Sequence, residues 1–136
     1  MQNSFPPGFE KEERNLSIDF DGVVHDDDKG FHDGTCYGQP IPGSIEAIID
    51  LSQTFRIIIF TAKAKSSRPL VEGKTGTQLV WEWLDKYGLA SYVAEVTAEK
   101  PRALLYIDDH ALSFRNWMET LQSPTLKSLK KSLNDT

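Results

Sequence analysis

The sequence has a single cysteine, Cys36, among its 136 residues. One cysteine cannot form an intrachain disulfide, and a zinc site built on several thiolates is excluded. The net charge of −5 means that basic residues are not in excess, which disfavours broad electrostatic binding to nucleic acid. No apolar run approaches the roughly 20 residues that a membrane-spanning helix needs, and residues 1–14 lack the apolar stretch of a signal peptide. We therefore expect a soluble cytoplasmic protein with one hydrophobic core.

The spacing of apolar residues predicts strands that alternate with helices. Residues 57–60 form an uninterrupted apolar run, which is typical of a strand buried on both faces of a parallel sheet. Ser44 is expected to cap a helix and Gly88 to end the next one. The predicted strands are 15–20, 56–60, 92–96 and 103–107, and the predicted helices are 44–53, 79–87, 114–121 and 126–133.

This order predicts an α/β protein with a three-layer, Rossmann-like parallel sheet and helices on both faces. Residues 1–14 are expected to form a flexible arm, 15–123 the single domain, and 124–136 a C-terminal helix or tail. Segment 21–43 is rich in Gly, Asp and Pro and is predicted to form a loop or small flap after the first strand. Neither this segment nor loop 62–76 has room for a large cap domain, so the site is expected to be open.

Polar residues that carry chemistry follow the predicted strands. Ligands in parallel α/β sheets bind beyond the carboxyl ends of the strands, so side chains at these ends share one pocket. The residues concerned are Asp19, Asp21, Thr61, Lys100, Asp108 and Asp109.

These residue types are suited to phosphoryl transfer. A carboxylate can accept a phosphoryl group and form a covalent acyl phosphate. An anionic phosphate does not approach Asp19 unless positive charge offsets the repulsion, which calls for Mg²⁺ and for Lys100. Mg²⁺ prefers oxygen ligands, which suits Asp19, the backbone carbonyl of Asp21 and the pair Asp108–Asp109.

Four motifs in order make the sequence similar to one family, the capless phosphatases of the haloacid dehalogenase superfamily. The similarity extends from Asn15 to about Leu121. The motifs are Asp19-Phe20-Asp21-Gly22-Val23-Val24, Thr61 closing Ile57-Ile58-Ile59-Phe60, Lys100 in Glu99-Lys100-Pro101, and Asp108-Asp109 closing Leu104-Leu105-Tyr106-Ile107.

The resemblance implies a role for each matching residue. Asp19 would attack phosphorus, and Asp21 would protonate the leaving group and then activate water. Thr61 would hydrogen-bond a phosphoryl oxygen, and Lys100 would balance charge. Gly22 would let the chain turn sharply into the flap.

The metal and substrate contacts follow from the same resemblance. One residue of the pair Asp108–Asp109 would bind Mg²⁺ directly and the other through water or Lys100, and the sequence leaves open which does so. The residues expected to contact substrate are Gly22, Thr61, Ala62, Lys63 and Lys100.

The function expected is a Mg²⁺-dependent hydrolase of phosphomonoesters such as nucleotides or sugar phosphates. A polynucleotide-end phosphatase is the alternative, because several basic residues are expected near the open site. They are Arg56, Lys63, Lys65, Arg68, Lys74 and Arg102. A non-catalytic module that binds Mg²⁺ or phosphate is the third hypothesis, and the intact pair Asp19 and Asp21 argues against it.

Two positions depart from the family pattern. Val23 stands where many members have Thr. His110 stands where a group that includes the phosphatase domain of polynucleotide kinase-phosphatases has Arg, which weakens the transfer of nucleic-acid specificity.

The residues His25, His32 and Cys36 lie on the Gly-rich flap. They are more typical of surface groups than of metal ligands, and contact of either histidine with substrate is left open.

Overall fold

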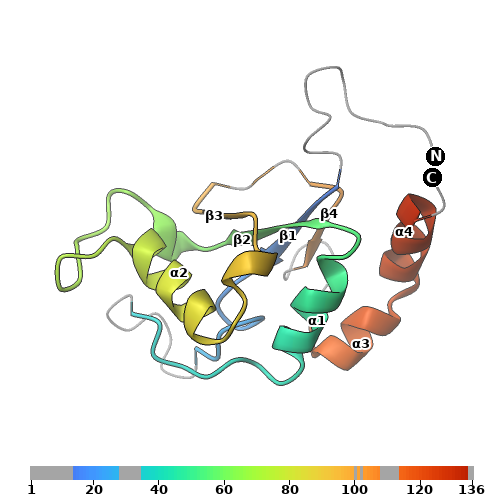
Figure 1. Cartoon of the computed structure of the whole chain (residues 1–136), viewed down its shortest axis with the longest axis horizontal. Coiled ribbons are helices and arrows are strands. Elements are labelled where there is room, and N and C mark those ends of the chain that lie inside the picture. Colours follow the sequence, from blue (N-terminus) through green and yellow to red (C-terminus); the bar gives the residue numbers. More distant parts are fainter. Residues whose placement is uncertain (1–13, 28–34, 100, 102, 108–113, 135–136) are drawn as a thin grey trace, which may run out of the picture.

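The computed structural model describes residues 14–27, 35–99, 101, 103–107 and 114–134. Its centre is a four-stranded sheet in which every neighbouring pair of strands is parallel (Figure 1). The strands are β1 (Asn15–Asp19), β2 (Arg56–Phe60), β3 (Glu95–Thr97) and β4 (Leu105–Ile107), in the spatial order β3-β2-β1-β4. This confirms the predicted α/β class with a Rossmann-like parallel sheet.

Four α-helices accompany the sheet in the described part of the chain. They are α1 (Ser44–Leu51), α2 (Gly76–Lys86), α3 (Trp117–Gln122) and α4 (Pro124–Asn134). Two short 3-10 helices, η2 (Ala62–Ala64) and η3 (Ala90–Tyr92), follow β2 and α2. Helix α3 contacts α1, and α4 continues directly from α3 (Figure 1).

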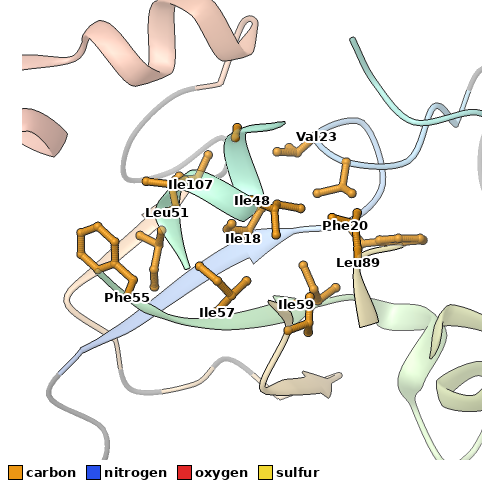
Figure 2. Close-up of a cluster of buried hydrophobic side chains, with 14 of the residues drawn as sticks. Ile18, Phe20, Val23, Ile48, Leu51, Phe55, Ile57, Ile59, Leu89 and Ile107 are labelled. Carbon is orange, nitrogen blue, oxygen red and sulfur yellow. The ribbon is translucent and has the colours of Figure 1, made fainter. Parts of the chain in front are cut away.

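The hydrophobic core lies between the sheet and the helices that pack on one of its faces. Ile18 of β1 is in register with Ile59 of β2, and both side chains belong to the buried cluster that also contains Ile48 and Leu51 of α1 (Figure 2). All four are fully buried, and each such side chain stabilises the fold by roughly 1.5–3 kcal/mol relative to exposure. Ile58 points to the opposite face and is also fully buried, so β2 is covered on both faces as its apolar run predicts.

The ends of several elements differ from the predictions for local reasons. Helix α1 is preceded by Gly43 in a left-handed conformation (φ 85°), and no side chain caps it, so the expected capping role of Ser44 is wrong. Helix α2 begins before 79, because Thr75 and Gln78 form a reciprocal capping box. Gly88 has a φ of 75° and follows the end of α2, as predicted.

Among the described residues, no helix combines the length and the apolar character needed to cross a membrane.

Candidate active site

The carboxyl ends of three strands meet at one edge of the sheet. Asp19 ends β1 and is in register with Phe60, the last residue of β2. The next residue, Thr61, donates its backbone N–H to the carbonyl of Thr97 at the end of β3 (2.9 Å). The structure therefore brings Asp19 and Thr61 to the same edge, as the sequence predicts.

A tight turn follows β1. Gly22 has a φ of 83°, which favours glycine, and its N–H bonds the carbonyl of His25 (2.8 Å). The N–H groups of Val24 and His25 both donate to the carbonyl of Phe20 (2.9 Å each). The turn folds the chain back so that the side chains of Asp21 and His25 are adjacent. It also confirms the sharp turn expected at Gly22.

The carboxylate of Asp21 is held by three side chains. His25 Nδ1 lies 2.9 Å and Lys63 Nζ 3.3 Å from Oδ1, while Thr61 Oγ1 lies 3.5 Å from Oδ2. Burial by itself raises the pKa of Asp21, but the hydrogen bond from His25 and the positive charge of Lys63 outweigh it. The net pKa is below the ordinary value, so the ionised carboxylate is favoured.

His25 is fully buried, so the expectation that it is a surface group is wrong. Its Nε2 atom is bonded by the backbone N–H of Gly38 (2.9 Å). Because a backbone N–H can only donate, Nε2 accepts and the ring proton resides on Nδ1. The imidazole therefore donates to Asp21 and has a fixed orientation between the carboxylate and Gly38.

Three aromatic rings surround the imidazole. Phe20 stacks on it at a centroid distance of 5.0 Å, and Tyr37 and Trp83 meet it edge-on at 5.1 Å and 5.5 Å. The indole N–H of Trp83 also bonds the carbonyl of Gly38 (2.9 Å). Trp83 of helix α2 thus holds Gly38 in position, and Gly38 in turn orients the ring of His25. The helical spacing of apolar residues does not predict this hydrogen bond of Trp83.

Lys63 contributes a buried positive charge. It lies in η2, where its backbone N–H bonds the Thr61 hydroxyl (3.2 Å), and only 1% of its surface is exposed. A Cβ added to Gly76 would lie 1.5 Å from the Lys63 carbonyl oxygen, so α2 starts in close contact with η2. Lys63 was expected to contact substrate, and its ion pair with Asp21 was not foreseen. Ala62, which is also expected to contact substrate, is exposed in η2.

Oxygen atoms suited to Mg²⁺ are present in the described part of the site. No described residue donates a hydrogen bond to the backbone carbonyl of Asp21, while its carboxylate is directed to Lys63 and His25. The Asp21 carbonyl oxygen is therefore of the chemical type and availability that Mg²⁺ binding would need. Within the described residues, no group of three His, Cys, Asp or Glu side chains forms a metal site. The predicted residues Lys100, Asp108 and Asp109 lie outside these residues.

Cys36 is half-buried on the flap, and His32 lies outside the described residues. Burial raises the pKa of the Cys36 thiol to about 12; the nearby Lys63 charge lowers it, and Asp21 raises it further. The thiol is therefore protonated at neutral pH, which makes Cys36 a poor nucleophile and metal ligand.

Two basic residues that were expected near the site are engaged elsewhere. Arg56 begins β2 at the end opposite to Thr61, where it bonds Asn15 Oδ1 (3.1 Å) and lies 3.9 Å from Glu95. Its expected place near the site is therefore wrong. Lys74 pairs with Glu82 (3.0 Å).

Comparison of the chain with protein-family models, with curated proteins and with solved structures finds no match.

Proposed function

We propose that this protein is a Mg²⁺-dependent phosphomonoesterase that works through a phosphoryl group on Asp19. The order of its motifs resembles that of the capless phosphatases of the haloacid dehalogenase superfamily. The observation that carries the proposal is the cluster at the sheet edge, where Asp21 bonds His25, Lys63 and Thr61 beside the end of β1. A carboxylate held in this way has a defined position and charge, which proton transfer requires.

In the first half of the reaction, the Asp19 carboxylate attacks phosphorus and the bond to the leaving oxygen breaks. Asp21 in its protonated form gives its proton to that oxygen. In the second half, the Asp21 carboxylate takes a proton from water, and the resulting hydroxide attacks the phosphoryl group on Asp19. Phosphate is released, Asp19 is restored, and Asp21 carries the proton that the next turnover needs.

The lowered pKa of Asp21 favours the second half of this cycle, because a carboxylate that is ionised is ready to accept a proton. Protonation of the leaving oxygen, in the first half of the cycle, is less favoured because it needs Asp21 in its protonated form. Esters whose leaving group needs little protonation are therefore expected to react fastest.

Positive charge at the site supports binding of an anionic phosphoryl group. Lys63 supplies such a charge next to Asp21, and Lys100 is proposed to supply another. Mg²⁺ would be held by Asp19, the Asp21 carbonyl, Asp108 and Asp109, and it would offset the charge of the phosphoryl oxygens.

The nucleophile is tested by trapping labelled phosphate on the protein. Rapid quench followed by mass spectrometry should find phosphate on Asp19 in the Asp21→Asn variant, because the variant still forms the acyl phosphate but hydrolyses it slowly. The Asp19→Asn variant should trap none and turn over at background. Label on another residue, or full turnover by Asp19→Asn, would contradict the proposal.

The metal is tested by its removal. Turnover of p-nitrophenyl phosphate should stop in excess chelator and return with Mg²⁺ but not with Ca²⁺, which favours more ligands at longer distances. Full turnover in chelator would show that no Mg²⁺ takes part.

A further inference from the structure

A hollow of about 430 Å³ lies beside the proposed phosphoryl site. It is formed by the chain that follows η2 and by the carboxyl end of β3. Its volume falls in the range of roughly 300–1,000 Å³ that small-molecule sites commonly have. The hollow is therefore large enough for the organic part of a small phosphomonoester.

One lining residue of the hollow is hydrogen-bonded to a proposed catalytic residue. Thr97 lines it, and the carbonyl of Thr97 accepts the backbone N–H of Thr61 (2.9 Å). Thr61 in turn reaches Asp21 through its hydroxyl (3.5 Å). The hollow therefore lies at the same edge of the sheet as Thr61, one strand beyond β2 from Asp19.

The lining of the hollow is polar and carries hydroxyl groups. Ser66, Ser67 and Thr97 each present a hydroxyl, and the Thr97 hydroxyl already accepts the backbone N–H of Glu99 (3.1 Å), which leaves its proton to donate. Lys65 and Glu99 add one charge of each sign. Neither charge has an ion-pair partner among the residues that the structure describes.

The lining also has no aromatic side chain within the described residues, and its apolar part consists of small groups such as Ala64 and Ala98. Nucleobases are commonly held by stacking on aromatic rings, which contribute about 1–3 kcal/mol per base. Hydroxyl, ammonium and carboxylate groups instead match the alternating donors and acceptors of a polyhydroxylated molecule.

We propose that this hollow holds the leaving group of the substrate, and that the substrate is a hydroxyl-rich, non-aromatic phosphomonoester, namely a sugar or polyol phosphate. The proposal rests on the function proposed above and narrows its substrate class. Glu99 accepts hydrogen bonds from substrate hydroxyls, while Lys65 and the serine hydroxyls donate to substrate oxygens.

The first test compares substrates on the unaltered protein with Mg²⁺. Hexose 6-phosphates and glycerol phosphate should have a kcat/KM at least tenfold above that of nucleoside 5′-monophosphates and of 3′- or 5′-phosphorylated oligonucleotides. Preference for nucleotides or oligonucleotides would overturn the sugar assignment and leave the phosphatase proposal standing. Failure to hydrolyse any ester, p-nitrophenyl phosphate included, would overturn the phosphatase proposal and this inference with it.

The second test alters the hollow. Ser67→Leu fills it and Glu99→Gln removes its acceptor charge, and both should lower kcat/KM for the sugar phosphate about tenfold more than for p-nitrophenyl phosphate. The matched controls are Ser91→Leu and Glu95→Gln, which alter exposed residues before and at the start of β3. Equal losses on both substrates would show that the hollow does not recognise a hydroxylated leaving group, and equal effects in the controls would show that the losses do not arise in the hollow.

A binding measurement separates affinity from chemistry. Asp19→Asn protein with Mg²⁺ should bind a hexose 6-phosphate more tightly than inorganic phosphate by calorimetry, and Ser67→Leu should remove that difference. If Asp19→Asn protein without the Ser67→Leu change binds the two ligands with equal affinity, the proposal is contradicted.

Discussion

His25 Nδ1 donates to Asp21 Oδ1 at 2.9 Å, while the other ring nitrogen of His25 accepts the N–H of Gly38. One buried imidazole therefore links the proposed proton-transfer carboxylate to the returning arm of the flap. Nδ1 contacts the carboxylate and Nε2 contacts the flap, so substitutions that keep one contact and remove the other can distinguish the two roles.

The first prediction concerns these two tasks. In His25→Asn the amide nitrogen takes the place of Nδ1 and can still donate to Asp21, whereas in His25→Gln the amide reaches the place of Nε2 and serves Gly38. Both variants lose the same ring stacking. We expect kcat to fall by on the order of 10²-fold in His25→Gln and distinctly less in His25→Asn, because a displaced catalytic group costs about that much.

Steady-state kinetics with p-nitrophenyl phosphate, together with circular dichroism to confirm folding, check this prediction. Equal losses in two folded variants would mean that His25 acts only through packing. A larger loss in His25→Asn would assign the main task to the contact with Gly38.

The second prediction concerns the charge of Lys63. Lys63→Met keeps the length of the buried chain but removes the ammonium group 3.3 Å from Asp21. Inhibition by the product phosphate should weaken by about tenfold or more, because the site loses a buried positive charge that attracts the anion. Lys131→Met, on the exposed side of α4, is the matched control and should leave the inhibition constant unchanged. Unchanged phosphate inhibition in Lys63→Met would remove Lys63 from the proposed site.

The third prediction follows from the lowered pKa of Asp21. A carboxyl group whose pKa is lower in the folded than in the unfolded state stabilises the fold above the unfolded value, near 3.8, and loses this contribution as pH falls through the folded value. The free energy of unfolding of the unaltered protein should therefore fall more steeply below about pH 4 than that of Asp21→Asn. Urea unfolding from pH 7 to pH 3 in chelator measures this, and parallel curves for the two proteins would contradict it.

The fourth prediction concerns Cys36. With a thiol pKa of about 12 in place of an ordinary value near 9.0, the thiolate fraction at pH 8 falls by about 10³-fold. Iodoacetamide should therefore alkylate Cys36 in the folded protein about 10³-fold more slowly than in denaturant, as followed by mass spectrometry. Similar rates in the two conditions would show that the thiol is not held in an apolar environment.

The strands and the site residues at their carboxyl ends were predictable, because the sequence patterns that indicate them are local. The apolar run of β2 and the alternation in β1 define two parallel strands, and the carboxyl ends of such strands meet at one edge. The convergence of Asp19, Asp21 and Thr61 follows from this rule alone.

The partners of Asp21 were not predictable, because they depend on how loops fold. His25 reaches Asp21 through the turn at Gly22, and it is buried because three aromatic rings and the backbone of Gly38 surround it. Lys63 is buried because a 3-10 helix directs its side chain inward, whereas a lysine in a polar loop is ordinarily exposed.

The capping role of Ser44 failed for a similar reason. A serine before an apolar periodic segment is a common N-cap signal. Here the preceding Gly43 adopts a left-handed conformation, so the helix starts one residue earlier than a serine cap would allow.

The last prediction concerns the contact between α2 and η2. A methyl group at Gly76 would lie 1.5 Å from the carbonyl oxygen of Lys63 and 2.6 Å from its carbonyl carbon, and both atoms belong to the backbone. Gly76→Ala must therefore move η2 away from α2, and overpacking of this kind costs about 1–3 kcal/mol of stability. Because η2 carries Lys63, the same change should also displace its ammonium group from Asp21 and weaken inhibition by phosphate.

The comparison variant is Gly73→Ala, where φ is positive (80°), unlike at Gly76, and no atom lies within 4 Å of the added methyl group. It should lose about 1–2 kcal/mol through the left-handed backbone alone and leave phosphate inhibition unchanged. Thermal unfolding and phosphate inhibition constants, measured side by side, distinguish the two variants. If both lose stability and only Gly76→Ala loses phosphate affinity, close packing of α2 on η2 positions Lys63; if phosphate affinity is unchanged in both, the position of Lys63 does not depend on that packing.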